Sequence, residues 1–514
     1  MFSTVLSASL RGLFVEFVHV EADTSNGLPM FHMVGYLSSE VKEAGERVRT
    51  AIKNSGIVLP AKKVVINLSP ANIRKRGTMF DLPIAIAILA SLGEVEEERL
   101  HDLLIVGELS LDGRVKQVPG VLPVVMEAKK RGIKTCIVPK ENQREGTLAD
   151  GITVIGVETL EEVCRILRGE TIRRQEIRED MRESVIPCEP SALDYSDIHG
   201  QRIAKRAAEI AAAGNHNLLM MGPPGSGKSM IAKRIPTILP PLTKEEGIEL
   251  TKLYSVAGSL NQEAPLMKAR PFREVHQSVT RAALIGGGVF PKPGELSLAH
   301  KGVLFLDEIA EFQKPVLELL RQPLEERQIK IIREQGEYVF PADVLLVAAM
   351  NPCPCGHYPD LNKCVCTSVQ IRNYLGRLSQ PFLDRIDLCV EVEKIRYQDL
   401  KEARREESSE EIRKRVCAAR SVQRKRYQNC RVSTNGELCV KEVEQYCRLG
   451  LEEEKMMRRA FEQMNLTARM YYKVLAVART IADLEGEEKI TAVHLGEALS
   501  YRSMDQKYWG GGAA

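Results

Sequence analysis

Short apolar runs alternate with amphipathic stretches along most of the chain, a pattern typical of α/β proteins. Val64–Leu68 and Leu103–Val106 are short and apolar, so they predict buried strands. Leu82–Leu92 is apolar almost throughout and predicts a buried helix, whereas Val124–Arg131 predicts an amphipathic one. Together these elements predict one α/β domain over residues 1–168.

The remainder of the chain divides at changes in composition. Residues 169–195 begin with a stretch that is crowded with Arg and Glu and poor in apolar residues, which predicts a charged linker. Residues 196–395 return to alternating strands and helices and predict a second α/β domain. Residues 396–507 have a helical pattern with Arg- and Glu-rich faces, and residues 508–514, rich in glycine, predict a flexible tail.

Composition narrows the classes of protein that fit. A chain of 514 residues suffices for about two to four domains, and a hydrophobic fraction of 44% supports well-packed cores. Charged residues make up 27%, but the net charge is only +3, which excludes a globally basic nucleic-acid binder and leaves local basic patches open. Aromatic residues are 5%, so an extended base-stacking platform is not expected.

The distribution of apolar residues also bears on location. The chain has no apolar run of about 18 residues, so we expect neither a transmembrane helix nor a membrane partner. Arg11 and Glu16 interrupt the apolar N-terminus and no small-residue cleavage site follows, so this segment predicts strands rather than a signal peptide. We therefore expect a cytoplasmic protein whose 12 cysteines are mainly reduced thiols or metal ligands.

Residues 222–229, GPPGSGKS, fit the pattern G-x-x-x-x-G-K-[ST] of loops that bind nucleotide phosphates. The apolar run 217–221 before this loop and the helix-compatible run 230–235 after it, up to Pro236, supply the strand and helix that the motif requires. Backbone N–H groups and the helix N-terminus attract anionic oxygens. Lys228 would reach the β- and γ-phosphates of ATP, and Ser229 would bind Mg²⁺. The predicted cofactor-binding residues are Gly222, Pro223, Pro224, Gly225, Ser226, Gly227, Lys228, Ser229 and Met230. The alternative is a glycine loop that only caps a helix.

Two later apolar runs deliver polar groups at their ends. The run 303–306 is followed by Asp307 and Glu308, which would bind Mg²⁺ and polarise the attacking water, respectively. The run 344–350 ends at Asn351, whose amide would hydrogen-bond the γ-phosphate or the water. Strands often end in acidic residues, and an Asn before Pro is often a simple turn. The combination with the nucleotide loop favours a hydrolytic site.

These motifs resemble those of AAA+ ATPases, and more narrowly those of the magnesium chelatase-like branch that includes the ComM/YifB proteins. The likeness covers nearly the whole chain, including the N-terminal domain. It implies an AAA+ P-loop α/β domain over 196–395 and a C-terminal helical lid over 396–507. Besides the nucleotide loop it rests on GVLFLDE at 302–308, NPCPCG at 351–356, FLDRID at 382–387, GGG at 286–288 and PGEL at 293–296.

The resemblance also implies roles for two arginines. Arg385, in the LDRID stretch, corresponds to an arginine that reaches the γ-phosphate bound by a neighbouring subunit, where it would stabilise the transition state. The alternative is an ion pair with Asp384 or Asp387. Arg469, at the start of a helix predicted to run to residue 482, resembles a sensor-2 arginine, with Arg479 as its rival and a surface ion pair as the alternative.

Two segments resemble substrate-handling elements. Residues 256–300 lie between the two Walker motifs, and residues 329–341 predict a β-hairpin. In related ring motors such hairpins line the pore, so Lys330 and Arg333 would follow a DNA backbone, unless the hairpin is merely solvated. The basic stretch 72–77 would contact DNA or form a solvated loop, and the one at 413–426 is more typical of a solvated helix face.

Four cysteines fall within 14 positions directly after Asn351 and form C-x-C-x8-C-x-C. Four thiolates match a closed tetrahedral zinc site, although C-x-C is tighter than the usual C-x2-C spacing. Reduced thiols or oxidation-prone pairs are the alternatives. The predicted structural zinc ligands are Cys353, Cys355, Cys364 and Cys366.

The N-terminal domain resembles the proteolytic domain of Lon, which has a ribosomal S5 domain 2-like fold, at residues 107–115 and 128–134. Lon chemistry needs a serine activated by a lysine. Alignment puts Phe80 at the serine position and Leu122 at the lysine position, so we expect no peptidase activity and a role in binding or ring assembly.

The resemblance implies a Mg²⁺-dependent ATPase that assembles into a ring, which we expect to be a homohexamer, and moves on single-stranded or branched DNA. ComM-like proteins are regarded as branch-migration helicases in recombination during natural transformation. The main alternative is a chelatase-like motor that remodels protein partners. A nucleotide-switched scaffold and an ATP-dependent protease are weaker alternatives, the last because of Phe80 and Leu122.

Overall fold

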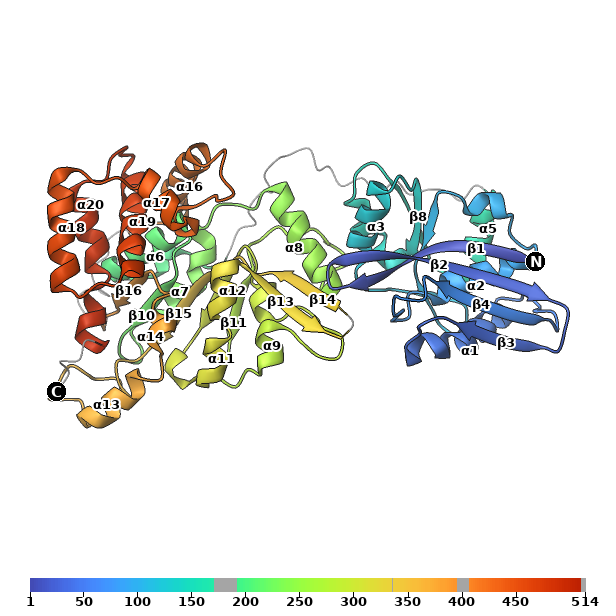
Figure 1. Cartoon of the computed structure of the whole chain (residues 1–514), viewed down its shortest axis with the longest axis horizontal. Helices are drawn as coiled ribbons and strands as arrows, with labels where there is room; N and C mark the ends of the chain where they lie inside the picture. Colours follow the sequence, from blue (N-terminus) through green and yellow to red (C-terminus); the bar gives the residue numbers. More distant parts are fainter. Residues whose placement is uncertain (171–191, 335, 395–405, 510–514) are drawn as a thin grey trace.

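The computed structural model describes residues 1–170, 192–334, 336–394 and 406–509. It confirms the predicted α/β fold class. Figure 1 shows an N-terminal α/β domain at one end, a second α/β domain in the middle and a group of C-terminal helices at the other end. The predicted linker lies mostly outside the described residues.

The N-terminal domain is built on a mixed seven-stranded sheet with the order β3-β4-β2-β1-β5-β8-β9. Helix α2 contacts β1 and β2 and every one of its residues is buried, which explains why its sequence is apolar on all sides. The strands are β1 (Phe2–Arg11), β2 (Phe14–Ser25), β3 (Met30–Val34), β4 (Lys63–Ser69), β5 (Leu103–Ile105), β8 (Thr135–Pro139) and β9 (Thr153–Val157), with a separate pair β6 (Glu108–Leu109) and β7 (Val115–Lys116). The helices are α1 (Ser39–Asn54), α2 (Asp81–Ser91), α3 (Val121–Lys130), α4 (Gln143–Thr147) and α5 (Leu160–Leu167).

The second domain contains a five-stranded sheet with the order β11-β12-β15-β10-β16, in which all neighbours are parallel. Both faces of this sheet are covered, so its inner strands β10, β12 and β15 are apolar without alternation, whereas the edge strand β11 carries Arg273 and Glu274. Its edge strand β11 lies within residues 256–300, so part of that segment is a component of the sheet. The strands are β10 (Leu218–Met221), β11 (Phe272–Val275), β12 (Val303–Leu306), β15 (Leu345–Met350) and β16 (Leu388–Glu391).

Helices pack on both faces of the parallel sheet. One face shares a hydrophobic core with α6, α7 and the C-terminal helices, of which α16 and α19 pack on α6. Helix α7 continues through Pro236 rather than ending there. The helices of this region are α6 (Arg202–Gly214), α7 (Lys228–Ile238), α8 (Lys244–Ala257), α9 (Arg281–Ile285), α10 (Glu295–Leu298), α11 (Lys314–Glu318), α12 (Arg321–Glu326), α13 (Ser368–Leu375), α14 (Gln380–Leu383), α16 (Ser409–Arg426), α17 (Val440–Tyr446), α18 (Leu451–Gln463), α19 (Ala468–Glu485) and α20 (Ala492–Ser500).

Helix α8 connects the second domain to the N-terminal one. Leu250 is fully buried within the hydrophobic core of the N-terminal domain, together with Leu242 and Leu266 from the segments beside α8. The backbone N–H of Gly120 donates to the carbonyl oxygen of Ser255 at 3.2 Å, and the Ser255 hydroxyl donates to Glu145. The two domains are therefore joined by apolar packing as well as by polar contacts.

Two cations of the basic stretch 72–77, Lys75 and Arg76, have partners within the protein and do not face DNA or solvent alone. Lys75 is fully buried, and its ammonium donates to the carbonyl oxygen of Pro70. The Arg76 guanidinium lies 3.7 Å from the centre of the Phe290 ring and 3.4 Å from the Tyr338 hydroxyl. Lys75 therefore stabilises its own loop within the N-terminal domain, and Arg76 holds that domain against the second one.

The hairpin predicted at 329–341 is present as β13 (Gln328–Arg333) and β14 (Gly336–Pro341). Ile329, Ile331 and Phe340 are buried, whereas Lys330 and Ile332 are exposed. One face of the hairpin therefore packs on the body of the protein and the other faces solvent.

The predicted flexible tail is wrong at its first two residues. Tyr508 is buried and its hydroxyl donates to Glu391 at 2.6 Å, while the Trp509 indole N–H donates to the Leu375 carbonyl oxygen at 3.2 Å. Residues 510–514 lie outside the described part. Within the described ranges, no helix is long and apolar enough to cross a membrane.

Candidate nucleotide site and its surroundings

The predicted phosphate loop lies between the carboxyl end of β10 and the start of α7, so its N–H groups and the helix N-terminus point to one place. Gly225 and Gly227 have φ of +74° and +91°, which disfavours other residues. A Cβ on Gly222 would lie 2.1 Å from the carbonyl oxygen of Val392. The loop therefore needs glycine at all three positions.

Lys228 is 8% exposed and lies within this loop. Its Nζ donates to the carbonyl oxygens of Gly222 and Pro223 at 2.7 and 3.0 Å, and to Asn351 Oδ1 at 3.3 Å. Burial lowers the pKa of Lys228, and the charges of the nearby carboxylates partly oppose this effect. The structure thus brings Lys228 and Asn351 together, although they are 123 positions apart.

The two residues predicted to bind Mg²⁺ are also in contact. Ser229 Oγ donates to Asp307 Oδ2 at 2.8 Å. A hydroxyl and a carboxylate are hard oxygen ligands of the kind that Mg²⁺ prefers, so the pair fits the ion.

Glu308 follows Asp307 at the end of β12, is exposed, and has a φ of +49°, which is unusual for a residue with a side chain. Such backbone strain is often found at functional sites. The conformation leaves the Glu308 carboxylate open to solvent beside the Asp307 and Ser229 pair.

Arg385 and Arg469 lie at the opposite end of the sheet from the nucleotide loop. Asn217 immediately precedes β10 and its Nδ2 donates to the Arg385 carbonyl oxygen at 2.8 Å, whereas the loop follows β10. Four strand residues span about 13 Å. Neither arginine side chain has a described contact with the nucleotide loop.

The two arginines meet at Glu325, a residue that the sequence analysis did not single out. Arg385 Nη2 lies 2.9 Å from Glu325 Oε1, and Arg469 Nη2 contacts the same oxygen. Of the alternative partners of Arg385, Asp387 pairs with Lys473 at 2.6 Å and Asp384 accepts a hydrogen bond from Gln380 at 3.4 Å. No sequence pattern marks Glu325, because it lies among ordinary helical Glu and Arg residues.

Arg479, the rival of Arg469, is 2% exposed and pairs with Asp483 at 3.1 Å in the middle of α19. Its guanidinium also donates to the carbonyl oxygens of Glu487 and Glu488. These contacts give Arg479 a role within the fold of the C-terminal helices.

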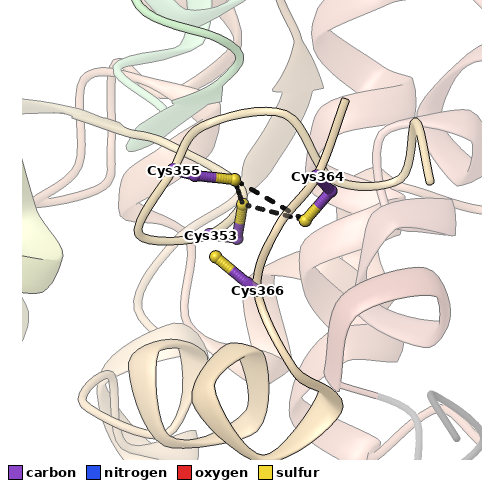
Figure 2. A group of neighbouring side chains, drawn as sticks. All are labelled: Cys353, Cys355, Cys364 and Cys366. Atoms are coloured by element: carbon purple, nitrogen blue, oxygen red, sulfur yellow. Dashed lines mark hydrogen bonds between the residues drawn. The ribbon is translucent and has the colours of Figure 1, made fainter. Parts of the chain in front are cut away.

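The four clustered cysteines converge in the loop between β15 and α13 (Figure 2). The sulfur of Cys353 lies 3.4 Å from that of Cys355 and 3.8 Å from that of Cys364, and all four sulfurs lie within 4.8 Å of one another. Sulfurs around tetrahedral zinc, at about 2.3 Å from the ion, are about 3.8 Å apart. The donor set and its spacing therefore fit a zinc site with four cysteine ligands.

The electrostatics of the cluster favour a thiolate at one position. Desolvation raises the pKa of Cys355, but hydrogen bonds from the backbone at His357 and Val365 and from neighbouring thiols lower it to about 6. A thiolate, rather than a thiol, is the form that binds a metal ion.

The cysteine loop lies directly against the phosphate loop. Gly356, between the two halves of the cluster, has a φ of +78°, and a Cβ added there would lie 2.4 Å from Pro224 Cδ. This close approach means that any displacement of the cysteine loop is transmitted to the nucleotide site.

The N-terminal domain contains no serine–lysine pair at the aligned positions. Phe80 and Leu122 are both fully buried in its hydrophobic core. The backbone N–H of Leu122 donates to Glu145 Oε1 at 2.7 Å, and this carboxylate also accepts the Ser255 hydroxyl of α8. The aligned lysine position thus lies beside the contact between the two domains.

Comparisons with known proteins cover almost the whole chain. Residues 194–400 match the family described as "Magnesium chelatase, subunit ChlI", residues 20–142 match "Subunit ChlI of Mg-chelatase", and residues 406–502 match the C-terminal part of the same subunit. Competence protein ComM of Haemophilus influenzae is 42% identical over 503 residues, which is 97% of each chain. YifB of Escherichia coli is 42% identical over 505 residues, 98% of this chain and 97% of that one. Lon protease 2 of Bacillus subtilis is 32% identical over 126 residues, 24% of this chain and 22% of the protease.

The contact between the two loops predicts the effect of Gly356→Ala. The added methyl group would collide with Pro224, so we expect the Kd for ATP to rise about tenfold or more, as measured by equilibrium binding of a fluorescent ATP analogue. Gly486→Ala is the matched control, because Gly486 has a similar φ of +77° but open space around its Cα. Equal Kd values for the two variants would show that the contact with Pro224 does not control ATP binding.

Proposed function

The chain belongs to the ComM/YifB family of magnesium chelatase-like AAA+ ATPases with a Lon-like N-terminal domain, and from this premise we propose that it is a ring-forming motor that moves branched DNA. The observation that supports a ring is the distance between two half-sites, the nucleotide loop with Lys228 and the arginine cluster with Arg385. Lys228 lies at one end of β10, and Arg385 is held at the other end through Asn217. An arginine so placed serves the nucleotide of a neighbouring subunit.

Each residue of the first half-site has a role in hydrolysis in this proposal. Lys228 and the loop N–H groups hold the β- and γ-phosphates of ATP, and Asn351 hydrogen-bonds the γ-phosphate or the attacking water. Ser229 and Asp307 would hold Mg²⁺, which neutralises phosphate charge when bound. Glu308 would orient and polarise the water.

The second half-site would supply positive charge in trans. Guanidinium groups from Arg385 and Arg469 would approach the neighbour's γ-phosphate and stabilise charge that develops in the transition state. Hydrolysis would then depend on assembly. We infer a homohexamer, the usual closed ring of AAA+ motors implied by the resemblance.

Contact with DNA would be made by the exposed face of the hairpin. Lys330 is exposed on it, and Arg333 is exposed next to the turn on the alternate side of β13, while Ile329 and Ile331 pack against the body of the protein. A cation held on a rigid strand can follow a phosphate backbone. The name of the relative ComM, a competence protein, supports action on incoming DNA and thus branch migration in recombination during natural transformation.

A chelatase-like motor that remodels protein partners is the second candidate. The descriptions of the three matched family segments, all named for magnesium chelatase, favour it. The two candidates differ in whether DNA changes the rate of ATP hydrolysis.

A structural zinc ion held by Cys353, Cys355, Cys364 and Cys366 completes the proposal. Zinc would tie the loop after Asn351 into one shape, and Gly356 would thereby support Pro224 in the nucleotide loop.

Glu308→Gln keeps the size of the side chain but removes the carboxylate that would polarise water. We expect ATP binding to be unchanged and turnover to fall by roughly 10²-fold or more, measured by equilibrium binding and by phosphate release. Glu311→Gln, which changes a nearby carboxylate paired with Arg377, should turn over like wild type. Near-normal turnover in Glu308→Gln would assign this residue another role.

Wild-type protein should hydrolyse ATP several-fold faster with forked or four-way-junction DNA and should unwind these substrates. The double variant Lys330→Glu/Arg333→Glu should lose the stimulation and show a shallower salt dependence of DNA binding. Lys455→Glu/Arg458→Glu on α18 is a control with the same change in charge. If no DNA is bound or stimulates hydrolysis, the protein-remodelling candidate takes precedence. If DNA stimulates the hairpin variant as strongly as it stimulates wild type, the DNA contact lies outside the hairpin.

Purified protein should contain about one zinc ion per chain by elemental analysis, because four thiolates close a structural site. Cys364→Ser should reduce this content to far below one. Cys417→Ser, which alters a cysteine on α16 outside the cluster, should retain it. Metal-free wild-type protein with unimpaired stability would refute the zinc site.

A further inference from the structure

We infer that Glu325 occupies, within each subunit, the place that a neighbour's γ-phosphate takes when the ring assembles, and that this carboxylate competes with ATP for the two arginines. The inference rests on the proposed role of Arg385 in trans. In this role Glu325 regulates assembly and sets the affinity of Arg385 and Arg469 for the neighbour's phosphate.

The geometry resembles the binding of one anion by two guanidinium groups. Glu325 projects from α12, Arg385 follows α14, and Arg469 lies in the first turn of α19, so three elements meet at one oxygen atom. If the carboxylate were absent, the two positively charged guanidinium groups would repel each other. The carboxylate thus holds the pair together in a single subunit.

The exposed fractions of the three side chains indicate which of them can move out of the cluster. The side chains of Glu325 and Arg469 are 42% and 40% exposed, whereas that of Arg385 is 11% exposed. A cavity of about 680 Å³, lined in part by these three residues, opens at this place. An incoming phosphate would therefore reach the arginines from solvent and displace Glu325, while Arg385 stays fixed.

The cluster carries more positive charge and more donors than Glu325 satisfies. Burial, followed by the charge of nearby Arg321, lowers the pKa of both Arg385 and Arg469, while Asp384 and Glu318 act in the opposite sense on Arg385. Arg321 pairs with Glu318 at 2.6 Å. The Nε atoms of Arg321 and Arg385 are buried without a described hydrogen-bond partner.

A terminal phosphate offers three oxygens and more negative charge than one carboxylate, so it matches this unused capacity better. Once it is bound, a carboxylate that remained beside it would repel it. Glu325 therefore weakens the trans contact by occupying the arginines before assembly and by opposing the phosphate afterwards.

Glu325→Gln removes the charge with little change in shape. We expect half-maximal ATPase activity at a subunit concentration lower by roughly fivefold or more, and the same shift in assembly with a slowly hydrolysed ATP analogue in sedimentation velocity. Glu326→Gln, one position along the same helix, should match wild type. Glu325→Ala should shift in the same direction, which guards against an effect specific to glutamine.

The outcomes separate this inference from the proposed function. Arg385→Ala should lose assembly-dependent hydrolysis. The double variant Glu325→Gln/Arg385→Ala should resemble Arg385→Ala, because it has no Arg385 guanidinium for Glu325 to release. If Arg385→Ala is active, the trans arginine itself is wrong. If Arg385→Ala is inactive but Glu325→Gln assembles like Glu326→Gln or more weakly, the trans arginine stands and the competing role of Glu325 is overturned.

Discussion

Strand β10 is the constraint on which the two half-sites depend. Its four residues, Leu218–Met221, are buried and paired in parallel with β15 on one side and β16 on the other. The phosphate loop begins where the strand ends, and Asn217 anchors the segment of Arg385 where the strand starts. Because a buried strand in the middle of a sheet neither stretches nor tilts freely, it keeps the Arg385 segment apart from the nucleotide loop of the same subunit. This separation supports the proposal that Arg385 acts on the nucleotide of a neighbouring subunit.

The same reasoning explains why some site residues are predictable. Asp307, Glu308 and Asn351 each follow an apolar run, and in a parallel sheet such positions meet at one edge. The elements themselves are also predictable where periodicity is strong, as in α2 or β15. Glu325 is not, because its role comes from three elements far apart in the chain, and nothing in its local sequence distinguishes it from a solvated helix residue.

Sequence reasoning fails where a tertiary partner replaces solvent. Lys75 and Arg76 belong to a basic stretch that composition assigns to DNA or water, yet a carbonyl oxygen and aromatic rings satisfy them. Tyr508 and Trp509 precede a glycine run and nevertheless pack. Arg76, Tyr508 and Trp509 gain partners from distant segments, which no local pattern encodes, and Lys75 is satisfied by the turn of its own loop.

The Lon-like N-terminal domain contacts the second domain at two places. Apolar side chains occupy the aligned dyad positions, and Ser255 of α8 reaches Glu145 beside Leu122. Helix α8 lies in sequence between α7, which carries the phosphate loop, and β11 at the sheet edge. On the other side, Arg76 touches Tyr338 of the hairpin. The domain thus contacts both the segment between the nucleotide motifs and the hairpin, so a shift in either would have to be accommodated by the other through this shared support.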